Sequence, residues 1–450
     1  MSTLEQLQTG SITSKQLGKN NRLKISENLT DFPREILDLA PNLEVLDLSD
    51  NQLSSLPDDF GRLKALRVLF LSNNLFDHVP AVLADCINLE MVSFKANRIA
   101  TIPENAFPKK LRWLILSHNQ IEKLPDSIGQ LDCLRKLALA GNRLTQLPES
   151  MAACSRLELV RLSANSLKSL PDWLLQLPKL AWLSFAGNEF CDGQKLIELS
   201  DEYRLVDIEM ADIKLMEQLG EGASGVVYRA EWINQPESLE GTNQYIAVKL
   251  FKGVVTSDGY VADEMACCLY AGSHPSLIKT LGRVSEGGQL GLIMELIPEN
   301  FINLGLPPTL DTCTRDTFKT GSTIEYYRLL RVLQNMAEMM THLHDNGVCH
   351  GDVYAHNTML DDSASVLFGD FGAASYSKVL PKHQQEALAK IEVRAFGCMI
   401  EDLLVIGVGE DLDFTLVEHL EALKVSCLQD VVSTRPEFRQ IEKQLANLNK

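Results

Sequence analysis

The chain has 450 residues, of which 45% are hydrophobic, and a formal net charge of −18 at pH 7. This length predicts two or three domains, each large enough to bury a core of its own. Residues 206–450 carry a net charge of −16. An acidic surface of this kind argues against the phosphate backbone of nucleic acids as a partner.

The cysteines and the apolar segments indicate the cellular compartment of the protein. The ten cysteines are scattered and form no CxxC motif or Cys/His cluster, which favours reduced thiols over disulfides or a zinc site. No N-terminal apolar run resembles a signal peptide, and no stretch of about 18 apolar residues could span a membrane. We therefore expect a cytoplasmic protein without a membrane span.

Residues 1–191 contain a repeat of 22 or 23 residues with the frame Leu-x-x-Leu-x-Leu-x-x-Asn, as in residues 111–119. One repeat cannot bury its leucines alone, whereas stacked repeats bury them in a continuous core, and each asparagine side chain can satisfy backbone groups at a bend. The pattern resembles the leucine-rich-repeat family, which implies an α/β solenoid of about eight repeats. The asparagines of the frame are Asn28, Asn51, Asn74, Asn97, Asn119, Asn142, Asn165 and Asn188.

The residues that flank the buried strand leucines are expected on the concave face, because side chains alternate along a strand. Most of the first flanking positions are apolar, and a contiguous apolar stripe suggests a contact surface. We expect a protein substrate or regulator to bind this stripe, and the alternative is that the stripe packs on the other half of the chain. The stripe consists of Val45, Val68, Phe70, Met91, Trp113, Ile115, Leu159 and Trp182.

A short linker is predicted at residues 192–206, before a second domain at 207–450. This domain opens with a glycine-rich segment, residues 219–227, whose glycines let a strand–turn–strand fold over phosphates with backbone N–H groups facing the oxygens. Lys249, on an apolar strand, supplies a cation for two of the phosphates. Glu264, fifteen residues later in a helical stretch, would pair with Lys249 and hold it in place.

Two further motifs, at residues 350–352 and 370–372, supply acidic groups. Asp352 can accept the proton of an incoming hydroxyl, while Asn357 and Asp370 offer oxygen ligands for Mg²⁺, with Mn²⁺ as the alternative. Each motif alone is weak, because a lysine on a strand is usually an edge residue and an aspartate is usually a turn former. All of them in this order indicate ATP-dependent phosphoryl transfer.

Together these motifs closely resemble the protein-kinase family over residues 207–450. The resemblance implies a multidomain chain in which the solenoid is followed by an α+β bilobal protein-kinase fold, with a long core helix over residues 324–344 and His350 packed in the core. It assigns catalysis to Asp352 and Lys249. The implied ATP-binding residues are Leu219, Gly220, Gly222, Gly225, Val227, Ala247, Lys249, Glu264, Glu295 and Ile297, and the implied metal ligands are Asn357 and Asp370.

Two residues depart from the pattern of that family. Gly351 replaces an arginine that normally reads a phosphate on the activation loop, and Tyr354 replaces a lysine. The segment after Asp370 is short, and the next helix is expected to begin near Glu392, in place of the usual aspartate. The only hydroxyls between are at residues 375–377, and without the arginine we expect activity not to require their phosphorylation.

The sequence therefore predicts a protein kinase that transfers the γ-phosphate of ATP to a Ser or Thr hydroxyl, with repeats for partner recognition or regulation. Two alternatives stay open. His-Gly-Asp at 350–352 also occurs in small-molecule kinases of the aminoglycoside-phosphotransferase type. Tyr354 and the short activation segment also fit a catalytically weak pseudokinase scaffold.

Overall fold

The computed structural model describes residues 2–13, 17, 20–194, 206–222, 224–256, 258–409 and 414–448. The chain divides into two compact units, Met1–Leu180 and Ala181–Lys450. Most of the predicted linker, residues 192–206, lies outside the described residues. The boundaries at residues 191 and 207 stay a prediction.

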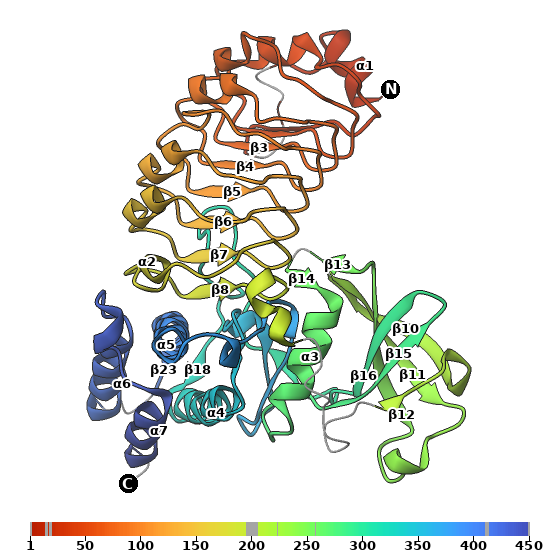
Figure 1. Cartoon of the computed structure of the whole chain (residues 1–450), viewed down its shortest axis with the longest axis vertical. Coiled ribbons are helices and arrows are strands. Elements are labelled where there is room, and N and C mark those ends of the chain that lie inside the picture. The colour runs from red at the N-terminus through yellow and green to blue at the C-terminus, as the bar shows by residue number, and fades with distance from the viewer. Residues whose placement is uncertain are drawn as a thin grey trace. The chain divides into compact units, whose positions relative to one another are not determined.

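The first unit is a stack of short parallel strands (Figure 1). The middle residue of each strand pairs with the middle residue of the next, as Leu46 does with Leu69. These middle side chains are at most 4% exposed, because each is covered by the neighbouring repeats. The predicted solenoid is thus confirmed. Its strands are β1 (Arg22–Lys24), β2 (Val45–Asp47), β3 (Val68–Phe70), β4 (Met91–Ser93), β5 (Trp113–Ile115), β6 (Lys136–Ala138) and β7 (Leu159–Arg161).

Short helices carry the chain back between these strands (Figure 1). An N-terminal helix, α1 (Thr3–Gln8), precedes the first strand and is capped by Ser2, whose side chain accepts the backbone N–H of Glu5. The later helices are mostly single 3₁₀ turns that begin just after a proline, a residue that suits the first turn of a helix. They are η1 (Arg34–Leu39), η2 (Phe60–Arg62), η3 (Ala81–Asp85), η4 (Asp126–Gln130), η5 (Glu149–Ala153) and the α-helical α2 (Asp172–Leu175).

From Asn51 onward, the asparagines of the repeat frame hold the bends together, as predicted, whereas Asn28 in the first repeat is exposed. The Asn51 side-chain amide donates to the carbonyl of Ile25 at 2.8 Å and to that of Leu48 at 2.9 Å. Its Oδ1 accepts the backbone N–H of Leu29 at 2.9 Å. Asn51 is only 6% exposed. One side chain therefore satisfies buried backbone groups of two consecutive repeats, which would otherwise be desolvated without a partner.

The concave apolar stripe is less exposed than its alternation predicts. Val45, Val68 and Met91 are between 5% and 8% exposed, and they pack together with partly buried neighbours. In parallel strands in register, equivalent side chains lie directly beside each other, so an apolar column covers itself. The structure corrects the prediction for these three residues and for Leu159, which is 3% exposed, because all four offer little free surface. The partly buried neighbours are Phe70, Trp113 and Ile115.

The second unit begins with β8 (Trp182–Ser184) and the 3₁₀ helix η6 (Glu189–Gln194). It contains a six-stranded sheet in the order β10-β11-β12-β16-β15-β9. Side chains such as Trp232, Val248 and Ile293 form an apolar cluster between these strands. The strands are β9 (Val206–Asp207), β10 (Ile213–Glu221), β11 (Gly225–Trp232), β12 (Tyr245–Phe251), β15 (Thr280–Glu286) and β16 (Gln289–Glu295).

One helix, α3 (Val261–Ala271), packs on this sheet, where Val261 and Met265 meet Phe251 and Leu292. The hairpin β13 (Val255–Thr256) and β14 (Gly259–Tyr260) leads into α3. The rest of the unit is mainly helical (Figure 1). The expected α+β bilobal fold is therefore confirmed, with a sheet lobe and a helical lobe.

The core of the helical lobe is α4 (Tyr326–Asp345), which begins two residues after the predicted start. Its apolar side chains recur at helical spacing and are buried, including Leu333, Met336 and Met340. Around it lie α5 (Lys382–Val405), α6 (Phe414–Cys427) and α7 (Phe438–Asn447), with the short strands β17 (Ile302–Asn303), β18 (Ile324–Glu325), β19 (Val348–Cys349), β20 (Thr358–Leu360), β21 (Val366–Phe368), β22 (Ser375–Tyr376) and β23 (Gly407–Val408). Among the described residues, no helix is long and apolar enough to cross a membrane.

The predicted helix start near Glu392 is wrong. α5 begins ten residues earlier, at Lys382, directly after Pro381, so Glu392 lies in the interior of the helix. The residues before Glu392 are helix formers without a strong capping signal, and Pro381 is the residue that could have marked the start.

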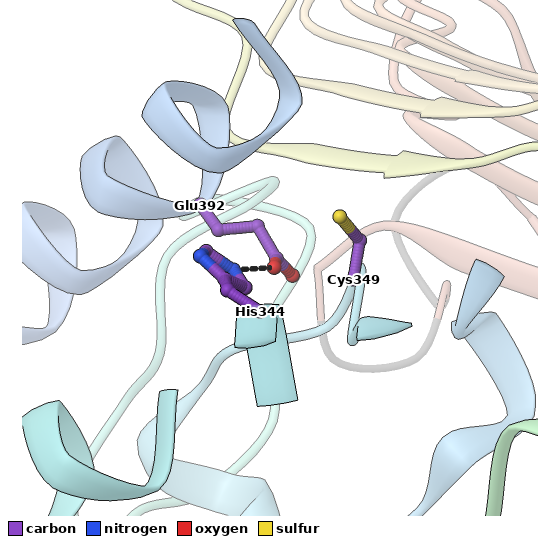
Figure 2. Close-up of side chains that lie close together, drawn as sticks. All are labelled: His344, Cys349 and Glu392. Atoms are coloured by element: carbon purple, nitrogen blue, oxygen red, sulfur yellow. Dashed lines mark hydrogen bonds and ion pairs between the residues drawn. The ribbon is translucent and has the colours of Figure 1, made fainter. Parts of the chain in front are cut away.

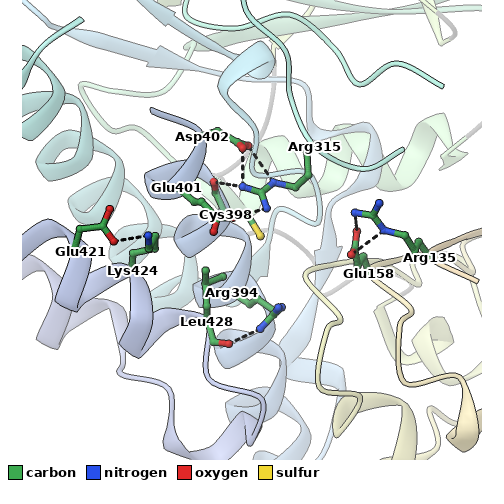
Figure 3. Close-up of polar contacts among 10 residues, drawn as sticks. All are labelled: Arg135, Glu158, Arg315, Arg394, Cys398, Glu401, Asp402, Glu421, Lys424 and Leu428. Atoms are coloured by element: carbon green, nitrogen blue, oxygen red, sulfur yellow. Dashed lines mark hydrogen bonds and ion pairs between the residues drawn. The ribbon is translucent and has the colours of Figure 1, made fainter. Parts of the chain in front are cut away.

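A polar cluster fastens the long loop before α4 to α5. The guanidinium of Arg315 faces two carboxylates of α5, and donates to Asp402 at 2.6 Å and to Glu401 at 2.6 Å (Figure 3). It also donates to the backbone carbonyl of Cys398 at 2.9 Å. Arg315 is 24% and Asp402 16% exposed at the side chain, so the pair is partly shielded from water.

We predict that Arg315→Met destabilises the second unit by roughly 2–3 kcal/mol, because it leaves the Asp402 carboxylate partly buried without its cation. Arg439→Met is the matched control, since Arg439 pairs with Asp345 at a site where both side chains are more than half exposed. An exposed pair contributes about 0–1 kcal/mol. Urea unfolding of both variants measures the difference, and equal losses would contradict the prediction.

Candidate functional site

The glycine-rich segment forms the turn between β10 and β11, as expected. A Cβ atom at Gly225 would lie 2.5 Å from the carbonyl oxygen of Leu250, so only glycine fits beneath the adjacent strand. In contrast, a Cβ atom at Gly220 or Gly222 would meet nothing within 4 Å. Packing within the chain therefore explains Gly225 alone. The other two glycines leave space over the cavity that a side chain would fill.

Lys249 extends from β12 towards α3, where its Nζ lies 2.6 Å from Glu264 Oε1 and 3.6 Å from Asp370 Oδ1. Both members of the first pair are well buried, with side-chain exposures of 12% for Lys249 and 3% for Glu264. Burial alone would lower the pKa of Lys249, but the carboxylates of Asp370 and Glu264 outweigh it and raise that pKa. Lys249 is therefore a fixed cation in the cavity wall.

The predicted base and one predicted metal ligand lie side by side after β19. The amide of Asn357 donates to Asp352 Oδ2 at 3.0 Å and to the Asp352 carbonyl at 3.0 Å. His350 is fully buried and ring-packed against Phe368 and Phe371, and its Nε2 lies 3.0 Å from the Gly369 carbonyl. Burial lowers the pKa of His350, so the ring is neutral and donates this bond. The expectation that His350 is a packing residue is confirmed.

Asp370 is held in an unusual conformation. Its φ of 60° lies in the left-handed region, which is costly for a residue with a side chain. Its Oδ1 accepts the backbone N–H of Gly372 at 3.4 Å, while the side chain is 57% exposed. This strained turn presents a carboxylate to the cavity opposite Lys249.

These elements surround a cavity of about 550 Å³ between the sheet and the helical lobe. This volume suits a nucleotide-sized ligand. Of the predicted residues, the cavity wall includes Leu219, Gly220, Gly222, Gly225, Val227, Ala247, Lys249, Glu264, Glu295, Ile297 and Asp370. Asp352 and Asn357 are not part of the wall and sit on the adjacent loop between β19 and β20.

Sequence reasoning missed several wall residues, among them Cys268, Ile278, Thr280 and Met359. Cys268 lies one turn after Glu264 on the same helix, so helical spacing could have placed it there. Met359 lies in β20, two residues after Asn357. Ile278 and Thr280 carry no motif, and only the fold brings them to the cavity.

His344, Cys349 and Glu392 form a cluster in which Cys349 and Glu392 are buried and His344 is partly buried (Figure 2). These residue types could hold a metal ion, but both carboxylate oxygens of Glu392 already have partners. One oxygen accepts the backbone N–H of Gly351 at 2.7 Å, and the other lies 2.6 Å from His344 Nε2. Glu392 therefore anchors the loop that carries Asp352, which is a structural role.

His356, on the loop between β19 and β20, forms a second histidine–carboxylate pair. His356 Nδ1 lies 2.6 Å from Asp316 Oδ1, and the Asp316 side chain is only 2% exposed. Burial alone would lower the pKa of His356, but the hydrogen bond to Asp316 and the charges of Asp316, Asp352 and Asp370 raise it overall. Both predicted acidic residues are therefore within electrostatic reach of this ring.

The structure corrects the prediction that Trp182 belongs to a partner-binding stripe and supports, for this residue, the alternative that the stripe packs on the second half of the chain. Trp182 is 1% exposed. Its ring stacks on Tyr354 with centroids 4.5 Å apart and planes 5° apart, and its Nε1 donates to the carbonyl of Val353 at 3.1 Å. Tyr354, the residue in place of the usual lysine, is itself 5% exposed and so lies beneath an aromatic cover. Repeat periodicity could not show this, because it carries no information on contacts far along the chain.

Comparisons with known families agree with both halves. The family model described as protein tyrosine and serine/threonine kinase matches residues 213–398. The leucine rich repeat model matches residues 21–76, 87–144 and 134–190.

Relatives match over part of the chain. It is 23% identical over 227 residues to the probable L-type lectin-domain containing receptor kinase S.7 of Arabidopsis thaliana, covering 49% of this chain and 30% of that protein. It is 26% identical over 169 residues to the putative serine/threonine-protein kinase/receptor R826 of Acanthamoeba polyphaga mimivirus, covering 37% and 9%. It is 27% identical over 172 residues to the cytoplasmic tyrosine-protein kinase BMX of Mus musculus, covering 38% and 23%. The chain thus spans less than a third of the length of these relatives.

The His356 pair predicts a pH-dependent stability. The folded pKa of His356 is raised, so its contribution is fully present below the unfolded value of about 6.5 and is lost as pH rises through the folded value. Asp316→Asn should therefore lower the melting temperature more at about pH 5.5 than at about pH 9. The exposed Asp362→Asn is the control. An equal decrease of the melting temperature at both pH values would show that the His356–Asp316 pair does not cause a pH-dependent stability.

Proposed function

We propose that this chain, which carries leucine-rich repeats followed by a protein-kinase domain, is an enzyme that transfers the γ-phosphate of ATP to a hydroxyl group of a protein. One observation carries the proposal. A cavity of nucleotide size joins the open glycine turn, the Lys249–Glu264 ion pair and the Asp370 carboxylate. Phosphoryl transfer depends mainly on positioning and charge stabilisation, which these groups are arranged to provide.

The residues of the cavity suit ATP and a divalent cation. Lys249 would hold phosphate oxygens, and Asp370 with Asn357 would hold Mg²⁺, or Mn²⁺, through oxygen atoms. Val227 and Ala247 offer an apolar surface to the adenine, with Leu219 beside them and the backbones of Glu295 and Ile297 at its edge. The metal, when bound, neutralises charge on the phosphates.

Asp352 is proposed to orient the acceptor hydroxyl and to take its proton. Its Oδ2 is fixed by the Asn357 amide at 3.0 Å, and its loop is anchored through Gly351 to Glu392. A positioned base needs such support, because a displacement of about 1 Å costs roughly 10²-fold in rate. Tyr354 cannot take the phosphate-binding role of a lysine, so the cationic contribution falls to Lys249.

The acceptor is proposed to be a Ser or Thr hydroxyl. The relatives include a serine/threonine kinase and a tyrosine kinase by name, so an assay needs peptides of both kinds. Leucine-rich repeats generally mediate protein interactions. We propose that a protein partner contacts the concave face at the partly buried Phe70, Trp113 and Ile115, with Val45, Val68, Met91 and Leu159 as the apolar support. A cytoplasmic location and the absence of a nucleic-acid partner belong to the same proposal.

We predict that Asp352→Asn lowers phosphate transfer on the order of 10²–10⁴-fold, because it removes the base and leaves the cavity wall intact. Nucleotide binding, measured by the shift of the melting temperature with ATP and Mg²⁺, should stay close to wild type. Lys249→Met should reduce both binding and transfer. The exposed Asp362→Asn, in the turn after β20, serves as the matched control.

A transfer assay with labelled ATP distinguishes a protein kinase from the two alternatives. The acceptors offered are Ser/Thr peptides, Tyr peptides, a cell lysate and an aminoglycoside. Transfer only to the aminoglycoside would favour the small-molecule kinase, and binding without any transfer would favour the pseudokinase scaffold. Wild-type turnover in Asp352→Asn would show that the role assigned to Asp352 is wrong.

A further inference from the structure

The segment 182–187, which we call the brace, contacts the loop that carries Asp352. The Trp182 ring covers Tyr354, and its Nε1 donates to the carbonyl of Val353 at 3.1 Å. Tyr354 and Val353 are the two residues directly after Asp352, and both are at most 5% exposed. A stacked aromatic pair and a buried hydrogen bond thus fix the backbone next to the proposed base.

The brace also accounts for Gly351, the residue before Asp352. Gly351 has a φ of 72°, a conformation that favours glycine. A Cβ atom there would lie 2.8 Å from the carbonyl oxygen of Leu183 in the brace and 2.6 Å from that of Ala373. The usual arginine side chain has no room at this position, because the Ala373 carbonyl and the Leu183 carbonyl of the brace both lie over it.

A third contact joins the brace to the segment after Asp370. Ser375 is fully buried, and its Oγ accepts the backbone N–H groups of Phe185 at 3.0 Å and of Ala186 at 3.2 Å. The hydroxyl therefore satisfies two buried backbone donors and is not free to receive a phosphate. This bond fastens the start of the activation segment to the brace.

The brace reaches the sheet lobe as well. Gly187 has a φ of 71°, and a Cβ atom there would lie 2.5 Å from the ring of Tyr260 and 2.7 Å from the Asp263 carboxylate. Asp263 is the neighbour of Glu264 on α3. One short segment therefore touches the base loop, the activation segment and the helix that holds the partner of Lys249.

We propose that Trp182 is a positioning residue for the proposed reaction, and that the brace holds the Asp352 loop and the activation segment in place without a phosphate on the activation segment. The inference rests on the proposed function in so far as Asp352 is the base. In the many kinases that use an arginine at the position of Gly351, a phosphate orders the activation segment. Here the backbone and Trp182 of the brace occupy that region and supply the order.

The test uses the full chain and two substitutions. Trp182→Ala removes the stack and the Nε1 donor, whereas Trp182→Phe keeps a smaller stacking ring and loses the donor. We expect Trp182→Ala to lower kcat roughly 10- to 100-fold while KM for ATP stays within about twofold, because the cavity wall is untouched. Trp182→Phe should recover part of kcat.

Hydrogen exchange provides a readout that needs no transferase activity. In Trp182→Ala, backbone exchange at residues 350–357 should accelerate about tenfold or more, while exchange in α4 stays unchanged. Trp173→Phe in α2 is the control for a ring change elsewhere. If the wild-type chain transfers no phosphate, hydrogen exchange alone tests whether the brace orders residues 350–357. A failure of this inference can therefore be distinguished from a failure of the proposed function.

Three outcomes would overturn the inference. The first is wild-type exchange and wild-type kcat in Trp182→Ala. The second is an equal loss of ATP binding and of protection throughout the second unit, which indicates a merely structural role. The third is activation by Ser375→Asp, because it would restore a phosphate-like switch. Should Trp182→Ala fail to fold, Trp182→Phe decides, and unchanged exchange at residues 350–357 would overturn the proposal.

Discussion

The candidate site depends on the ion pair between Lys249 and Glu264. Both charges are largely removed from water, with side-chain exposures of 12% and 3%, and such burial is tolerated only when each charge has a partner. The pair lies between β12 and α3, so the helix cannot move away from the sheet without leaving the buried Glu264 carboxylate without its cation. The position of α3 is thereby fixed, and with it the wall of the cavity.

The sequence revealed the parts of the fold that are encoded locally. The repeat frame predicts the strands and the asparagine bends, because stacking repeats only requires neighbours of the same kind. The glycine-rich segment, Lys249, Glu264 and Asp370 predict most of the cavity wall, since each lies on one strand, helix or turn, whereas Asp352 and Asn357 lie on the adjacent loop. Lys249 and Glu264 meet at 2.6 Å as predicted from their order along the chain.

Contacts between distant segments could not be predicted in the same way. Trp182 sits in a repeat frame that predicts an exposed side chain, yet it stacks on Tyr354, more than 170 residues later. Val45 and Val68 alternate as exposed residues would, but their parallel register makes them cover each other. Glu392 is a third case. The sequence predicts that a helix begins near this residue, whereas α5 begins ten residues earlier, at Lys382.

The two departures from the kinase pattern have one physical origin. Gly351 and Tyr354 look independent in the sequence, since the first predicts activity without a phosphate on the activation segment and the second fits a weakened enzyme. In the structure both accommodate the same segment, since Gly351 leaves room for the Leu183 carbonyl and Tyr354 provides a flat surface for Trp182. Substitutions that look like losses when compared with a motif can therefore be adaptations to a neighbouring segment.

The buried hydroxyl of Ser375 has a consequence for any enzyme that would modify this chain. A modifying kinase can reach the hydroxyl only in molecules whose 182–187 segment has detached, and its apparent affinity falls by the fraction of such molecules. Detachment breaks the two bonds from Phe185 and Ala186 and uncovers Tyr354, so that fraction is small. Phosphorylation of Ser375 would keep the 182–187 segment detached, because a bulky, charged group could not return to the buried site of the hydroxyl.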